Sequence, residues 1–132
     1  KYKWMAPGTL GITSGDSIDL LDDTIKVALI DTGTYTFSQT HEYWSSAVGS
    51  IVGTAATLAS KTLTDNVFDA ADVTYTSVTG NSVEALIIFK DTGTNATSPL
   101  IAFIDTVASG LPVTPNGGNI TITWNASGIF AL

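Results

Sequence analysis

The chain has 132 residues, of which 44% are apolar and 13% are charged, and it contains no cysteine. This composition excludes a disordered chain, and the lack of cysteine excludes disulfide scaffolds and thiolate metal sites. The formal net charge is −7 with no arginine, so we expect no nucleic-acid partner and no docking on an acidic membrane surface.

The first 17 residues predict an irregular N-terminal arm. Turn-forming Pro and Gly residues recur there without a periodic apolar pattern. Tyr2, Trp4 and Met5 have no strand of their own to pack on, so we expect this apolar arm to dock onto a neighbouring subunit. Because the chain begins at Lys1 and not at a methionine, we expect further residues to have preceded it.

The first half of the remaining chain predicts one strand, a short helix and a second strand. The elements in order are a helical turn or loop at 18–23, a strand at 24–31, an extended stretch at 35–37, a short helix at 40–50, and a strand at 56–64. Thr40 is the expected N-cap of the helix, and Gly49 lies near its C-terminus. Residues 67–71 predict an irregular crossing after a turn at 65–66.

The second half predicts strands joined by Gly, Pro and Asn turns. Alternation over 72–79, the Gly80-Asn81 pair and the apolar run 83–89 together indicate a β-hairpin spanning 72–90. Further strands are expected at 99–106, 119–125 and 129–132, with a loop at 112–118. Trp124, in the alternating strand 119–125, is expected in the core.

These elements predict an all-β fold. We expect one domain over residues 1–132, with the arm at 1–17 and the core at 18–132. The core is expected to be a single antiparallel β-sandwich or jelly-roll-like barrel of seven or eight short strands, with at most one or two short helices.

The tetrapeptide Asp-Thr-Gly-Thr occurs twice, at 31–34 and 91–94, and each copy ends an apolar run. Paired copies of this pattern supply the two carboxylates of an aspartic protease, here Asp31 and Asp91. The same pattern is typical of a buried strand that meets a tight turn, where Asp accepts a backbone hydrogen bond and Gly takes a positive φ. Lys90 beside Asp91 favours the turn interpretation, because a cation would lower the pKa of a carboxyl that must share a proton.

Few other side chains suggest a site. His41 is the only imidazole, and with Tyr43 it is expected at a surface or an interface; Trp44 is assigned to the same interface, with sugar stacking by Tyr43 or Trp44 as a rival. The acidic group at positions 16, 19, 22 and 23 predicts a solvated loop or, alternatively, a bound cation, although it lacks the spacing of a calcium loop. No other metal, cofactor or catalytic residue is expected.

Several segments together resemble a group of small structural proteins of tailed bacteriophages. These segments are 22–32 with 35–38 and His41, 67–75, 84–93, 98–102, 110–118, 120–124 and 129–132. The resemblance covers about residue 18 to the C-terminus and does not cover the arm. It implies a virion component and not an enzyme, and it carries no catalytic residue to this chain.

Within that group, a capsid decoration (cement) protein is the expected role, because the chain is small, acidic, cysteine-free and rich in β-structure. The expected partners are the major capsid protein, on the outer surface of the virion shell, and other copies of the chain as a dimer or trimer. Assembly is expected in the cytoplasm of a bacterial host. A tail or head-fibre component that contacts the host is the alternative, and an aspartic protease is the lesser one.

Overall fold

The computed structural model describes residues 18–106 and 110–132, and a four-stranded antiparallel sheet lies at its centre. The strand order is β2-β1-β6-β7. These strands are β1 (Ile25–Ile30), β2 (Ile51–Thr57), β6 (Ala85–Lys90) and β7 (Leu100–Ile104). The two central strands, β1 and β6, pair in continuous register from Ile25 opposite Lys90 to Ile30 opposite Ala85.

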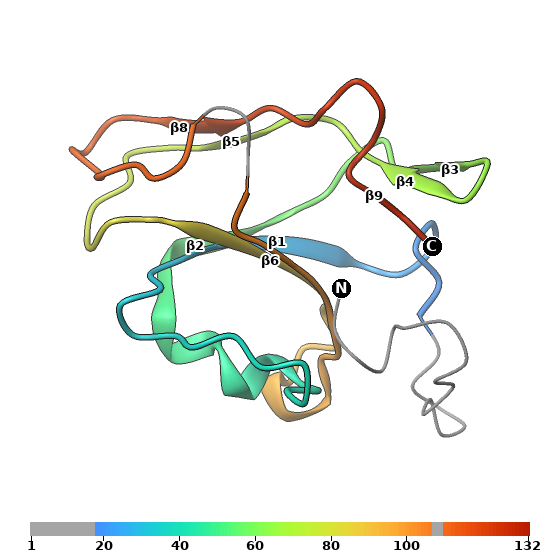
Figure 1. Cartoon of the computed structure of the whole chain (residues 1–132), viewed down its shortest axis with the longest axis horizontal. Helices are drawn as coiled ribbons and strands as arrows, with labels where there is room; N and C mark the ends of the chain where they lie inside the picture. Colours follow the sequence, from blue (N-terminus) through green and yellow to red (C-terminus); the bar gives the residue numbers. More distant parts are fainter. Residues whose placement is uncertain (1–17, 107–109) are drawn as a thin grey trace.

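Two smaller sheets form a second layer over one face of the central sheet (Figure 1). One consists of β5 (Val73–Tyr75) and β8 (Ile120–Ile122), and the other of β3 (Thr62–Thr64), β4 (Val67–Asp69) and β9 (Phe130–Ala131). Between the layers lies the larger apolar core, to which β1, β4 and β6 contribute Leu29, Phe68 and Ile88, all fully buried. The Tyr75 hydroxyl crosses this core and donates a 2.8 Å hydrogen bond to the Val27 carbonyl.

A third layer covers the opposite face of the central sheet. It consists of residues 31–50, which include the 3-10 turns η2 (Trp44–Ser46) and η3 (Val48–Ser50), with η4 (Asn95–Thr97) beside them. The Trp44 indole stacks on the Phe89 ring with centroids 4.3 Å apart and an interplanar angle of 4°. Tyr35 and Ala47 belong to the same buried apolar cluster as Ile30 and Ile87 of the central sheet.

Burial on both faces explains the two continuous apolar runs of the sequence. A strand with one solvated face alternates apolar and polar residues, whereas a strand covered on both faces is apolar throughout. Every residue of β1 and β6 is buried except Lys26 and Lys90, which are partly exposed. Each fully buried Ile or Leu contributes about 1.5–3 kcal/mol to the hydrophobic stabilisation, so the β1–β6 pair is the densest source of stability in the described fold.

The prediction of an all-β, antiparallel fold is confirmed. The described residues form nine strands, more than the seven or eight expected, because residues 56–64 divide between β2 and β3 and residues 67–69 form a strand that was not predicted. Their helical elements are three 3-10 turns of three residues, and none is long and apolar enough to cross a membrane. The predicted arm lies outside the described residues.

The predicted hairpin over 72–90 is wrong. Strand β5 pairs with β8, and β6 pairs with β1 and β7. Both segments turn an apolar face toward the same core, Tyr75 from one layer and Ile88 from the other. Because the two faces oppose each other across that core, the segments lie in different layers and cannot be neighbours in one sheet.

Three other element predictions also need correction. The helix predicted over 40–50 is two separate 3-10 turns, and the residue that precedes the first is Tyr43, without a side-chain cap, and not Thr40. The strand predicted over 56–64 breaks near Ser60, whose φ is 51°, and its two parts belong to β2 and β3 in different layers. Residues 67–69 form strand β4, because Phe68 is buried between neighbours on both sides.

Gly128 provides a test of how closely β4 approaches the turn before β9. Its φ is +95°, and an added Cβ would lie 2.2 Å from Val67 Cγ1 and 3.2 Å from the Phe68 carbonyl oxygen. Gly117 is a matched control, because its φ is +85° but an added Cβ would meet nothing within 4 Å.

We expect Gly117→Ala to lower the free energy of unfolding by about 1–2 kcal/mol through backbone strain alone. Gly128→Ala should cost about 1–3 kcal/mol more, because it adds overpacking to the same strain. Urea unfolding of the two variants measures the difference. Equal losses would contradict the close approach.

Candidate interaction surfaces

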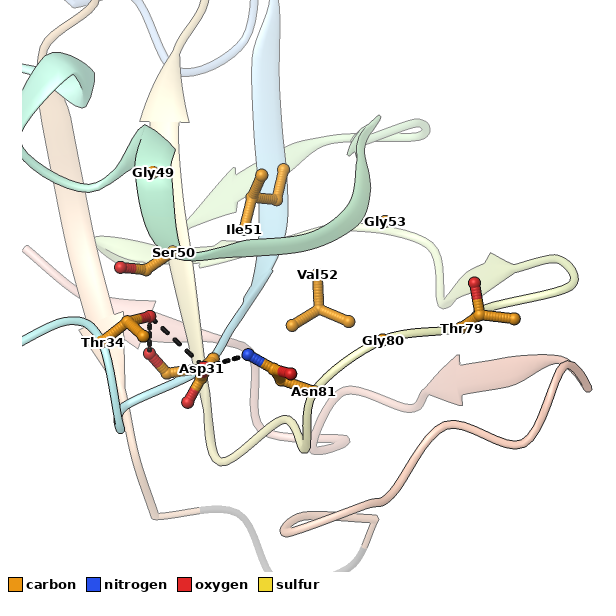
Figure 2. A pocket seen from close by; sticks show the side chains of 10 residues that line it. All are labelled: Asp31, Thr34, Gly49, Ser50, Ile51, Val52, Gly53, Thr79, Gly80 and Asn81. Atoms are coloured by element: carbon orange, nitrogen blue, oxygen red, sulfur yellow. Dashed lines mark hydrogen bonds between the residues drawn. The ribbon is translucent and has the colours of Figure 1, made fainter.

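A shallow hollow of about 270 Å³ lies at the end of β1 (Figure 2). Its lining comes from the first Asp-Thr-Gly-Thr turn, from η3 and the start of β2, and from residues 79–81. Asp31 is one of the lining residues and lies between Thr34 and Asn81 (Figure 2). This places one of the two aspartates singled out in the sequence in a concave site.

The Asp31 carboxylate is fully engaged by its own chain. Oδ2 accepts a 2.8 Å hydrogen bond from Asn81 Nδ2 and a 3.3 Å bond from Thr34 Oγ1, and Oδ1 accepts a 2.7 Å bond from the Gly33 amide. These donors, Asn81 first, favour the ionised form and hold the pKa of Asp31 below its ordinary value. Asp31 therefore anchors residues 80–81 to the end of β1.

The predicted hydrogen bond of the repeated tetrapeptide is confirmed at both copies, but the predicted positive φ occurs at Gly93 and not at Gly33. Asp31 accepts from the Gly33 amide, and Asp91 Oδ1 accepts from the Gly93 amide at 2.9 Å. Glycine suits the two turns for different reasons. Gly93 has a φ of +84°, whereas at Gly33 an added Cβ would lie only 2.9 Å from Asp31 Oδ1.

The proposed catalytic pair of Asp31 and Asp91 is contradicted by the strand register. Asp31 follows the end of β1 and Asp91 follows the end of β6, and these strands are antiparallel, so the two carboxylates lie at opposite ends of the sheet. Six paired residues at about 3.4 Å each separate them by about 20 Å. Two carboxylates share a proton only in direct contact, so this pair cannot act as the dyad of an acid protease.

The cation beside Asp91 is Lys26 and not its chain neighbour Lys90. Lys26 Nζ lies 2.5 Å from Asp91 Oδ2, whereas Lys90 Nζ lies 2.8 Å from Asp23 Oδ2. Lys26, as hydrogen-bond donor, and the Gly93 amide lower the pKa of Asp91. The sequence argument expected a cation to act on Asp91 but named the wrong lysine, because side chains pair across the β1–β6 ladder and not along the strand.

The expected interface residues divide into three groups. Tyr2, Trp4 and Met5 lie outside the described residues. His41 and Tyr43 are partly exposed, and His41 Nδ1 is hydrogen-bonded to the Tyr35 hydroxyl at 2.9 Å. The expectation that Trp44 is an interface residue is wrong, because its side chain is 4% exposed and stacks on Phe89 in the core beneath the third layer.

An aromatic cluster that includes His41 lies where the third layer meets strand β7. We define it as Tyr35, Phe37, His41 and Phe103. The Phe37 and Phe103 rings are stacked with centroids 4.8 Å apart, and Tyr35 tilts against both His41 and Phe103. Tyr35 is buried and the other three are partly exposed, so the cluster presents aromatic edges at the surface. Aromatic residues are enriched in protein interfaces.

A second apolar surface was not predicted from the sequence. Leu21, Leu63 and Leu132 are 44%, 38% and 49% exposed, and they are the exposed large hydrophobic residues of the described chain. All three line one hollow of about 380 Å³, which we call the leucine hollow, together with Ile18, Asp19 and Leu20. Each leucine comes from a different segment, so no local sequence pattern could have shown that they meet.

The acidic group beside the leucine hollow forms a tight loop. Asp19 Oδ1 accepts the Leu21 and Asp22 amides at 2.9 and 3.1 Å, and these bonds lower the pKa of Asp19. Asp23 Oδ2 accepts the Asp19 amide at 2.7 Å and pairs with Lys90. No three acidic or histidine side chains within the described residues are grouped to hold a metal ion, and Asp16 lies outside them.

Acid unfolding tests the anchoring role of Asp31. Its pKa is lower in the folded chain than in the unfolded chain, so the unfolded state takes up more protons as the pH falls below about 4 and stability is lost there. We expect Asp31→Asn to be less stable than wild type near neutral pH, and the difference to shrink between about pH 5 and about pH 2. Asp65→Asn, in an exposed turn, is the control. A difference for Asp31→Asn that stays constant with pH would contradict the anchor.

Comparison with other proteins adds no assignment. No family model and no curated protein matches this chain. The resemblance of its segments to phage structural proteins therefore stays a prediction, and function has to be argued from the chain's own residues.

Proposed function

We propose that this protein is a bacteriophage virion structural protein, and specifically a decoration protein that binds the outer surface of the capsid shell and stabilises it. The resemblance of the segments between residue 22 and the C-terminus supports the virion assignment. The all-β fold with a net charge of −7 suits a subunit that coats the outside of a shell, because acidity keeps it away from the packaged DNA.

The aromatic cluster is the observation that supports a contact with the shell. Phe37 and His41 in the third layer and Phe103 in strand β7 place partly exposed rings at one surface, and Tyr43 in the third layer is also partly exposed. The buried Tyr35 contacts the His41 and Phe103 rings, and Phe103 stacks on Phe37, so the rings are held in place before any partner arrives. A preorganised aromatic surface loses little side-chain entropy on binding, and many copies of a modest contact add up over a shell.

Copy number in purified particles tests the proposal. Quantitative mass spectrometry of virions that encode this chain should find on the order of hundreds of copies per particle, as expected for a subunit that follows the shell lattice. About six to a few tens of copies would instead place the protein in the tail or at a vertex, which is the alternative role. Absence from the particle would overturn both assignments.

A pair of surface variants tests which layer meets the shell. Ser45 lies exposed in η2, on the layer of the aromatic cluster, and Thr123 lies exposed just after β8, in the second layer. Arginine at either position adds the same charge and bulk. We expect Ser45→Arg to weaken binding to undecorated particles by at least about tenfold, because a cation is buried unpaired.

Thr123→Arg should bind as wild type does, since its side chain faces away from that contact. Co-sedimentation with particles over a range of protein concentrations gives both affinities. The reverse ranking of the two variants would show that the second layer, and not the aromatic cluster, faces the shell.

A further inference from the structure

The leucine hollow is an apolar surface that the shell contact does not use. It combines the three exposed leucines with the partly buried Ile18 and the buried Leu20, and Asp19 lies on its rim. The hollow lies at the junction of the loop before β1, strand β3 and the residue that follows β9. A gathering of exposed large apolar side chains on an otherwise polar surface marks an interaction site.

We propose that the leucine hollow of one copy binds the N-terminal segment, residues 1–17, of a second copy of this chain, with Trp4 and Met5 entering the hollow. This contact joins copies to one another and is separate from the shell contact proposed above. Two copies can exchange their segments reciprocally, which fills two hollows through one two-fold axis.

Charge favours this occupant. Residues 18–132 carry three lysines against eleven acidic side chains, a net charge of −8, whereas residues 1–17 carry Lys1 and Lys3 against Asp16, a net charge of +1. Two copies of the acidic part repel each other, and this segment is the part of the chain that brings net positive charge to a partner. The exposed Asp19 and Asp22 beside the hollow are the carboxylates that would face Lys1 and Lys3.

Chain length allows a second copy to be the occupant. The segment joins the core at Ile18, on the hollow itself, and the residues just before it, 13–17, are all polar or glycine. Met5 is 13 residues away, a distance of up to about 45 Å when extended. That exceeds the radius of gyration of a domain of this size, about 13 Å, so the apolar end of the segment can reach a neighbouring copy.

Crosslinking between single-cysteine variants tests the inference. Because the chain has no cysteine of its own, each introduced cysteine is the only thiol that can react. Met5→Cys is prepared in one batch and Leu63→Cys in a second batch of different mass. The batches are mixed and treated with a short bismaleimide. We expect a covalent heterodimer that joins the two variants, which mass spectrometry identifies. Thr123→Cys in place of Leu63→Cys is the control and should give little product, because Thr123 is also exposed but is not part of the hollow.

The double variant Met5→Cys/Leu63→Cys separates the other outcomes. Crosslinking only within single chains would show that the segment folds back on its own core, which would overturn the second copy as occupant. Failure of both experiments would overturn the segment itself as occupant. Neither result depends on particles, so each is distinct from a failure of the shell assignment.

Sedimentation of the untagged full chain supplies a second measurement. We expect self-association that weakens in high salt, since the contact pairs exposed charges. Leu63→Asp should raise the dissociation constant by at least about tenfold, because it removes a leucine side chain that the contact would bury and puts a carboxylate among the apolar side chains there. Self-association unaffected by both changes would contradict the proposal. Far-UV circular dichroism of Leu63→Asp confirms that the exposed substitution leaves the fold intact.

Discussion

Burial of the β1–β6 pair on both faces is the constraint on which the rest of the structure depends. An antiparallel sheet usually leaves one face to water, so this sheet needs two covering layers. The small sheets of β3, β4, β5, β8 and β9 supply one, and residues 31–50 with Trp44 supply the other. Because this third layer is mostly loop and 3-10 turn, some of its side chains are buried against the sheet and others are exposed at the surface. The aromatic cluster lies there, with Tyr35 below and Phe37 and His41 nearer the surface.

The same pair determines what happens at its ends. Antiparallel pairing places the two Asp-Thr-Gly-Thr turns at opposite ends of the sheet, where each aspartate holds a nearby segment. Asp31 fastens residues 80–81 to β1, and Asp91 pairs with Lys26 across the ladder. Near the Asp91 end, Lys90 holds Asp23, and this tie places the loop of Leu20 and Leu21 beside Leu63 and Leu132. The leucine hollow is thus a consequence of how that end of the sheet is closed.

The sequence predicted what short-range physics controls and missed what depends on contacts between distant segments. Continuous apolar runs revealed β1, β6 and β7, and the Asp and Gly of each tetrapeptide revealed the turns, because those residues meet their partners within three positions. The prediction of a hairpin over 72–90 was wrong for a related reason. The sequence shows that Tyr75 and Ile88 face a core, but this pattern is the same whether their strands are neighbours in one sheet or lie in two sheets on opposite sides of that core. Trp44 was assigned to an interface because the residues near it in the sequence could not show that it stacks on Phe89. Trp124, expected in the core, packs against the core but remains partly exposed. The leucine hollow gave no signal, since Leu21, Leu63 and Leu132 meet only in the folded chain.

Amide hydrogen exchange tests the central role of the doubly covered pair most directly. If β1 and β6 are the structural centre, their amides exchange only through global unfolding, so residues 25–30 and 85–89 should be the slowest of the chain and share one opening free energy equal to that from urea unfolding. Strands β3 and β9, at the end of the second layer, should open at lower free energy. Exchange of residues 25–30 as fast as that of residues 62–64 would contradict the account.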